Sequence, residues 1–228
     1  MGDRVLVEKG GEIIPKIVKN LSNSPLKGEN AGEESTQEAF PSREGLGGPV
    51  PFVESCPVCG AKLVRYEGEA AHYCPNDTGC PPLIQGRIEH FISRKAMNIS
   101  FLGPETVDEY FQRGLIRDAA DLYELTEEQL SDPLASDNKG VRKILASIEQ
   151  SKKVPFERVL YAIGIRFVGE IAAKTLARYY GSMDKVMEAT TDSLLQINGI
   201  GEVIAGSIIQ FFANPVNRRF VERLREYG

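Results

Sequence analysis

A glycine-containing turn between two helical patterns constrains the fold of this chain more than any other feature. The turn reads Asn-Gly-Ile-Gly and contains Gly199 and Gly201. After it, Ile204, Ile208 and Phe212 recur at helical spacing. Glycine adopts turn dihedrals that other residues avoid, and it lets another backbone approach closely. The segment therefore predicts a helix, a tight hairpin and a second helix.

The second helix of this hairpin begins without a side chain that could cover its first N–H groups. These groups lie at the positive end of the helix dipole, where a phosphate oxygen is favourably bound. An ordinary turn between two packed helices is the alternative interpretation. One hairpin alone does not decide between the two.

The sequence resembles itself at an offset of 64 residues. This offset aligns Tyr123, Glu124, Leu125, Thr126 and Leu130 with Met187, Glu188, Ala189, Thr190 and Leu194. It also aligns Val141, Ile144, Leu145 and Ile148 with Ala205, Ile208, Ile209 and Phe212. A repeat of this length indicates a duplicated helical unit. Two further hairpins, at 101–104 and 167–169, bring the prediction to four helix–hairpin–helix units between about residue 87 and residue 213.

Composition limits the classes of protein that need to be considered. The length of 228 residues allows one or two domains, and no apolar run is long enough to span a membrane. The N-terminus does not have the pattern of a signal peptide, so we expect a cytoplasmic protein. The net charge of −5 argues against a uniformly basic nucleic-acid coat. Any DNA contact must therefore use local clusters of cations and backbone amides.

The first 51 residues predict two different segments. Residues 1–20 alternate and are rich in β-branched side chains around the Gly10-Gly11 turn, which is typical of a β-hairpin. Two strands alone are marginally stable, so we expect this hairpin to belong to a larger β domain. Residues 21–51 are rich in Ser, Asn, Gly, Pro and Glu, which predicts a flexible linker.

Four cysteines form the next feature. Two residues separate Cys56 from Cys59, 14 separate Cys59 from Cys74, and five separate Cys74 from Cys80. Two such turns supply the four thiolates of a closed, structural zinc site. A redox Cys-x-x-Cys pair is the alternative, but it does not explain the second pair of cysteines. His72 is a competing ligand that we consider less favourable than the cysteines.

From residue 87 onward the apolar pattern is helical, so the chain is predicted to be mainly α. The expected domains are the β-hairpin at 1–20, the linker at 21–51, a four-cysteine zinc finger at 52–86, a tandem hairpin domain at 87–213 and a terminal helix at 214–228. Expected helices within the hairpin domain include 104–112, 141–148, 156–163 and 169–180. Thr126 with Gln129 predicts a capping box, and Gly181 a C-terminal cap.

Several of these segments resemble the C-terminal half of bacterial NAD-dependent DNA ligases. The resemblance rests on the spacing of the four cysteines, on Gly-Glu-Ile-Ile-Pro at 11–15, on His-Phe-Ile-Ser-Arg-Lys-Ala-Met at 90–97 and on Leu-Tyr-Ala-Ile-Gly-Ile-Arg-Phe-Val-Gly-Glu at 160–170. It covers essentially the whole chain and implies the end of an OB-fold, a zinc finger and a domain of four helix–hairpin–helix motifs.

The resemblance also implies a function. Ligases of this family transfer AMP from NAD to a lysine of a Lys-x-Asp-Gly motif and then to the 5′-phosphate of a nick, in DNA replication and repair. That motif is absent here, so NAD and Mg would be bound outside this chain. The implied partners are nicked duplex DNA in the bacterial nucleoid and the adenylation, OB and BRCT domains of the same ligase. We expect a monomer that grips the minor groove without sequence preference and is not catalytic alone.

The candidate DNA contacts are backbone groups and cations. They are Gly103, Gly169, Gly199 and Gly201, with Lys139, Arg166 and Lys174 as supporting charges. Glutamates 105, 170 and 202 follow three of the glycines and would disfavour a phosphate if they pointed at it. The 64-residue offset places Asp137 where Gly201 stands, so the second hairpin is expected to serve mainly as scaffold, with Lys139 as its DNA contact.

Two alternatives belong to other classes of protein. The chain would be a free-standing zinc-finger and helix–hairpin–helix repair or recombination protein if its N-terminal β-hairpin were complete in itself. It would be a structural platform for other ligase domains, with little DNA affinity of its own, if the net negative charge dominated its surface.

Overall fold

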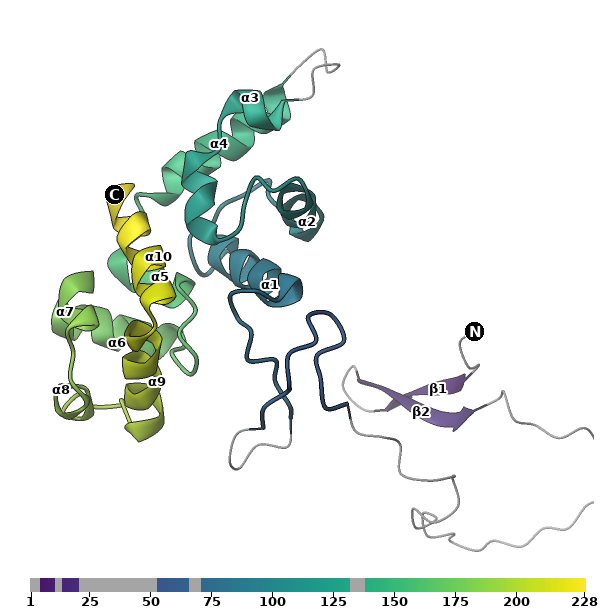
Figure 1. Cartoon of the computed structure of the whole chain (residues 1–228), viewed down its shortest axis with the longest axis horizontal. Helices are drawn as coiled ribbons and strands as arrows, with labels where there is room; N and C mark the ends of the chain where they lie inside the picture. Colours follow the sequence, from purple (N-terminus) through teal and green to yellow (C-terminus); the bar gives the residue numbers. More distant parts are fainter. Residues whose placement is uncertain (1–4, 11–13, 21–52, 66–70, 132–137) are drawn as a thin grey trace, which may run out of the picture. The chain divides into compact units, whose positions relative to one another are not determined.

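The computed structural model describes residues 5–10, 14–20, 53–65, 71–131 and 138–228. The chain divides into two compact units, 1–51 and 52–228. The described part of the second unit is helical from residue 81 onward, as Figure 1 shows, whereas its preceding segment contains turns and two isolated β-bridges. The described β-structure of the first unit consists of two strands. The predicted class, mainly α with a small β part, is confirmed.

The two strands of the first unit form an antiparallel pair. Strand β1 covers Val5–Gly10 and β2 covers Ile14–Asn20, with Val7 opposite Ile17 and an irregularity between Leu6 and Val7. The predicted β-hairpin is therefore present. Its turn at residues 11–13 and the predicted linker at 21–51 both lie outside the described residues.

The second unit contains eleven helices in its described part. They are α1 (Pro81–Ile92), α2 (Pro104–Gln112), η1 (Ala119–Glu124), α3 (Glu127–Leu130), α4 (Lys139–Ser151), α5 (Phe156–Ala162), α6 (Glu170–Tyr180), α7 (Met183–Met187), α8 (Thr191–Leu195), α9 (Glu202–Ala213) and α10 (Pro215–Glu226). In the described part of the chain, no helix is long and apolar enough to cross a membrane.

The first of these helices begins earlier than expected. Helix α1 starts at Pro81, six residues before the predicted domain boundary at residue 87, so that boundary falls inside a helix. Two prolines occupy its first positions, where their missing N–H groups cost no hydrogen bond. The expected pattern began only at the apolar Ile88, because the first turn of α1 carries little periodic signal.

The helices pack around two apolar clusters. The first cluster is formed mainly by α1, α2, η1, α3 and α4, and the second by α5 to α9 together with Val221 of α10. Phe220 and Leu224 of α10 and Tyr161 of α5 pack against both clusters. Helix α10 therefore does not extend away as a free tail, and it joins the two halves of the unit.

The two halves repeat each other as the sequence predicted. Thr126 caps α3 and Thr190 caps α8, each with a reciprocal capping box, and the two residues are 64 positions apart. Leu130 and Leu194 at the equivalent positions are both buried. At the same offset η1 in the first half corresponds to α7 in the second. Both short elements were missed by the sequence analysis, because five or six residues are too few to show a clear periodicity.

An arginine of the terminal helix pairs with three carboxylates of the first half. Arg223 of α10 contacts carboxylate oxygens of Asp118 at 3.0 Å, Asp121 at 2.6 Å and Glu124 at 2.6 Å. Its guanidinium is largely shielded, with 23% of the side chain exposed. Desolvation raises the pKa of Asp118, and the charge of Asp121 adds to that effect, whereas Arg223 opposes it. The arginine therefore compensates a concentration of negative charge around η1.

Replacing this arginine should destabilise the fold. Arg223→Met leaves Asp118 and Asp121 close together without their cation, and we expect a loss of about 2 kcal/mol of unfolding free energy in urea titrations near neutral pH. The loss should shrink as pH falls toward about 4, because the native-state pKa of Asp118 rises further without Arg223 and protonation then favours the folded state.

The matched control is Arg225→Met on the same helix. Arg225 pairs with Asp184 at 2.9 Å, but both side chains are about half exposed, so the expected loss is below about 1 kcal/mol. Equal losses for the two variants would show that the Arg223 cluster has no special role.

Candidate metal centre and nucleic-acid interface

The first pair of cysteines lies on a tight turn. The amide of Gly60 donates to the carbonyl of Cys56 at 2.9 Å, and the amide of Cys56 donates to the carbonyl of Ala61 at 2.8 Å. Gly60 has a φ of +73°, a conformation that residues with a Cβ rarely adopt. The turn brings Cys59 back beside Cys56, as the Cys-x-x-Cys-Gly spacing predicted.

The second pair lies on a longer turn that runs directly into the helical domain. The amide of Cys80 donates to the carbonyl of Asn76 at 2.9 Å, which closes the turn that follows Cys74. Cys80 is also the N-cap residue of α1, and the amides of Leu83 and Ile84 donate to its carbonyl oxygen. A cysteine of the four-sulfur cluster and the start of a core helix thus coincide in one residue.

The four sulfur atoms converge. The Sγ atoms of Cys56 and Cys80 are 3.8 Å apart, those of Cys59 and Cys74 are 3.4 Å apart, and all four lie within 4.8 Å of one another. Four thiolates bound tetrahedrally at the usual Zn–S distance lie about 3.8 Å from each other. The donor set and its spacing fit zinc and leave no position for a substrate, so the metal is structural.

The two turns shift the pKa values of their cysteines in opposite directions. A hydrogen bond from the amide of Ala61 lowers the pKa of Cys59 to about 6, and amides of Cys59 and Val58 lower the pKa of Cys56. Desolvation instead raises the pKa of Cys74, and it raises the pKa of Cys80 to about 12. The first turn is therefore prepared to hold thiolates, whereas the second depends on a bound cation to lose its protons.

Three of the predicted hairpins share one backbone geometry. In each of them an exposed residue at positive φ precedes a buried apolar residue and then the glycine that caps the next helix. The three sets are Phe101-Leu102-Gly103 before α2, Phe167-Val168-Gly169 before α6 and Asn198-Gly199-Ile200-Gly201 before α9. The described half of the second hairpin shows α4 beginning after Asn138, while Asp137 lies outside the described residues.

Two of these hairpins carry backbone strain. Phe101 has a φ of +66° and Phe167 a φ of +63°, where the last hairpin has Gly199 at +89°. A residue with a Cβ pays about 1–2 kcal/mol for this conformation. Of the described non-glycine residues only Asn98 shares a positive φ, and asparagine tolerates it better. Sequence patterns gave no sign of this strain.

The helices after these hairpins begin without a capping side chain at the N-cap position. The N-cap residues of α2, α4, α6 and α9 make no side-chain hydrogen bond to the first turn of their helices. The glutamate that opens α6, Glu170, pairs with Lys95 at 2.6 Å, and this contact raises the pKa of Lys95. The positive charge of Lys95 therefore reduces the repulsion between the Glu170 carboxylate and a phosphate at this helix start.

The predicted supporting cations differ in their surroundings. The Arg166 guanidinium lies 4.7 Å from the ring centroids of both Tyr73 and Phe167, so it is stacked between the zinc-binding segment and a hairpin. Lys174 is exposed on α6, and Lys139 is the exposed first residue of α4. The sequence analysis named these three cations as supporting charges, and it could not reveal the aromatic stack of Arg166.

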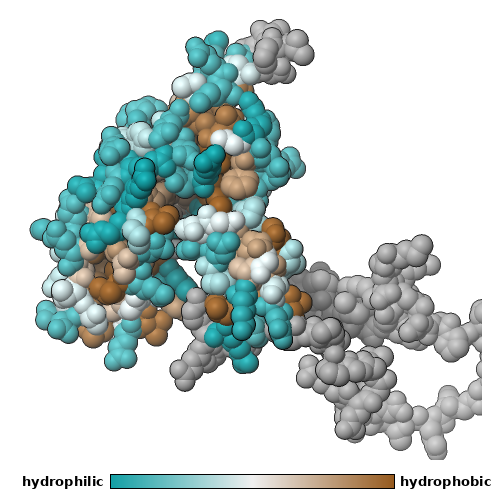
Figure 2. Space-filling view, viewed as in Figure 1, coloured by the Kyte–Doolittle hydropathy of each residue, from teal (hydrophilic) through white to brown (hydrophobic). Residues whose placement is uncertain are grey.

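The third and fourth hairpins line a common depression. It is shallow and open, has a volume of about 620 Å³, and is lined by Tyr161, Gly169, Glu170, Ile171, Ala172, Gly199 and Ile204. Of the predicted site residues it brings together Gly169 and Gly199, whereas Gly103 and Lys139 lie elsewhere. Ile171, 85% exposed, is an apolar lining residue that the sequence analysis did not consider. Figure 2 shows such apolar side chains scattered over a mostly polar surface.

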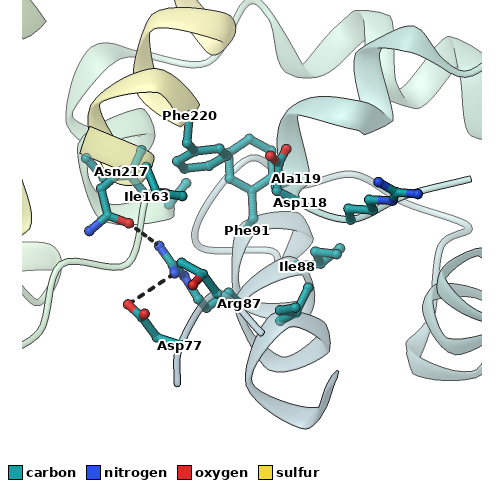
Figure 3. Close-up of a pocket in the computed structure, with 14 residues that line it drawn as sticks. Asp77, Arg87, Ile88, Phe91, Asp118, Ala119, Ile163, Asn217 and Phe220 are labelled. Atoms are coloured by element: carbon teal, nitrogen blue, oxygen red, sulfur yellow. Dashed lines mark hydrogen bonds and ion pairs between the residues drawn. The ribbon is translucent and has the colours of Figure 1, made fainter. Parts of the chain in front are cut away.

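A more enclosed cavity of about 200 Å³ lies away from all of these residues. Arg87 of α1 pairs there with Asp77 at 3.5 Å and with Asn217 of α10 at 3.2 Å. Figure 3 shows these contacts and the neighbouring rings of Phe91 and Phe220, which also line the cavity. It contains none of the cysteines or hairpin glycines. It marks the place where the second cysteine turn, α1 and α10 meet.

Comparisons with known proteins agree with this geometry. Residues 55–81 match the NAD-dependent DNA ligase C4 zinc finger domain, and residues 158–221 match the helix-hairpin-helix motif. The chain is 53% identical to a DNA ligase of Phocaeicola vulgatus, 50% to one of Bacteroides fragilis and 47% to one of Parabacteroides distasonis.

Each of these matches covers 100% of this chain but 32% of the relative, so the chain spans about a third of the length of the curated relatives it matches. The ligase-specific zinc finger lies in the segment where the four sulfur atoms converge. The chain is thus similar along its whole length to a part of proteins named DNA ligase, and its cysteine segment matches the zinc finger domain of the NAD-dependent ones.

Proposed function

We propose that this chain is a DNA-gripping part of an NAD-dependent DNA ligase and holds nicked duplex DNA through the phosphate backbone. The observation that carries the proposal is the depression shared by two hairpins, with Gly169 and Gly199 in its lining. Helices α6 and α9 both begin there without a capping side chain at the N-cap position. Amides at helix starts bind phosphate oxygens and read no bases, so binding is indifferent to sequence.

In the whole protein this part would work beside domains that perform the chemistry. The AMP transfer from NAD, the Mg²⁺ that assists it and the adenylated lysine belong to those domains. The N-terminal β-hairpin would complete an OB-fold, and four helix–hairpin–helix motifs would form the second gripping surface around a nick. Such a role would place the protein on chromosomal DNA, while the chain by itself would have no ligase activity.

The charges near the hairpins are consistent with this role despite the net charge of −5. Lys95 neutralises Glu170, and Lys174 and Lys139 stand on the helices that follow two hairpins. Because contacts with phosphates release counterions, affinity for the duplex should fall steeply with salt. The gripping surface is therefore local, and bulk charge does not determine it.

We also assign Cys56, Cys59, Cys74 and Cys80 as the ligands of the structural zinc. The bound metal would supply the charge that stabilises four neighbouring thiolates and would hold the two turns together. Since Cys80 caps α1, the same metal would fix the beginning of the helical domain.

The zinc assignment predicts the effect of removing one ligand. Cys80→Ser should abolish stoichiometric zinc and lower Tm by about 5 °C or more, because the turn at 74–80 and the start of α1 both lose their anchor. Metal analysis and circular dichroism measure the two quantities. His72→Ala is the control and should keep its zinc. Unchanged unfolding in strong chelator, after verified metal removal, would sink the assignment.

The hairpin assignment predicts the effect of adding one methyl group at each glycine cap. A Cβ at Gly169 or Gly201 meets no atom within 4 Å, and neither residue has a positive φ, so the folding free energy should change by less than about 1 kcal/mol. If phosphates approach these backbones closely, Gly169→Ala and Gly201→Ala should each weaken duplex binding about tenfold. Fluorescence anisotropy with a labelled nicked duplex at several salt concentrations measures the effect.

Gly206→Ala supplies the matched control within α9. Its added Cβ is equally unhindered, but the residue lies inside the helix and not at the hairpin. It should bind DNA as the unaltered chain does. If the unaltered chain bound no duplex even at low salt, the hairpins would serve as scaffold and the proposal would fail.

A further inference from the structure

We propose that Phe101 and Phe167 are DNA-contacting residues whose rings enter the minor groove of the duplex between the phosphates held by their hairpins. The proposal rests on the DNA-gripping function above and identifies side chains that act there in addition to backbone amides. The rings would contact deoxyribose and base edges, the apolar parts of the nucleotide.

Burial in the apolar core does not explain these two side chains. Each occupies the positive-φ position where glycine would be free of strain, as Gly199 is in the last hairpin. Each is also exposed, Phe101 to 64% and Phe167 to 50%. A strained backbone that displays a large apolar side chain to solvent is expected where the side chain serves a function.

Each ring lies close in sequence to the backbone amides that we propose bind phosphate, at the starts of α2 and α6. Phe101 lies two residues before Gly103 and Phe167 two residues before Gly169, which cap α2 and α6. The intervening Leu102 and Val168 are buried and anchor the hairpins in the core. A ring at this position is held on a fixed backbone immediately beside amides that face outward.

Each ring also contacts a cationic side chain. The Lys143 ammonium is 5.5 Å from the ring centroid of Phe101, and the Arg166 guanidinium is 4.7 Å from that of Phe167. Minor-groove proteins combine apolar wedges, often phenylalanine, with lysine and arginine in the same way. The cations complement the phosphates that border the groove, so this pairing favours duplex DNA over an uncharged apolar partner.

The experiment replaces each phenylalanine by glycine, the residue that stands at the equivalent position of the last hairpin as Gly199. Phe101→Gly and Phe167→Gly relieve the positive-φ strain, so Tm should not fall. Each should weaken binding to a nicked duplex about fivefold or more, and the double variant further. The salt dependence should stay unchanged because no phosphate contact is lost. A minor-groove dye bound to AT-rich duplex should be displaced by the unaltered chain and less by the variants.

Tyr179→Ala is the control, since this exposed ring stands at the end of α6 away from its hairpin, and it should leave binding unchanged. Duplex binding that survives in both glycine variants would overturn the ring proposal and leave the phosphate-gripping function intact. A dye that stays in place on the fully bound duplex would overturn the minor-groove assignment. Failure of the unaltered chain to bind duplex would overturn both the rings and the function beneath them.

Discussion

The buried apolar residue in the middle of each described hairpin is the constraint on which the rest of the helical unit depends. Leu102, Val168 and Ile200 are each about 5% exposed and belong to the apolar clusters. Because these side chains point into the core, the residue before them and the glycine after them must face outward. Core packing thus presents the amides of the helix starts at the surface, and fold and proposed function follow from the same three positions.

Helix α10 is one of the elements that join the two halves that carry the hairpins. Its Phe220 packs against both clusters, and its Arg223 gathers three carboxylates around η1. Without that helix the halves would share fewer apolar contacts, although Lys95 and Glu170 also connect them. The spacing between hairpins of different halves therefore depends in part on a helix that follows the last hairpin and packs against the first half.

Much of this arrangement could be predicted from the sequence, because repetition and cysteine spacing are strong local signals. The 64-residue offset correctly paired Thr126 with Thr190, and the four cysteines converge as expected. The start of α1 at Pro81 was missed because its first turn has no apolar period. The strained φ of Phe167 and its stack with Arg166 depend on tertiary packing, which no local pattern encodes.

The double role of Cys80 has a consequence for how the protein tolerates metal loss. No linker separates the metal site from α1, because Cys80 is the N-cap residue of that helix. The cysteine segment is therefore not expected to unfold independently of α1. Local unfolding of the cysteine turns would extend into α1 toward Ile88 and Phe91, which are two of the most deeply buried side chains of the first cluster. Loss of zinc would therefore loosen the first apolar cluster of the helical unit as well as the two cysteine turns, so its effect would extend beyond the metal site.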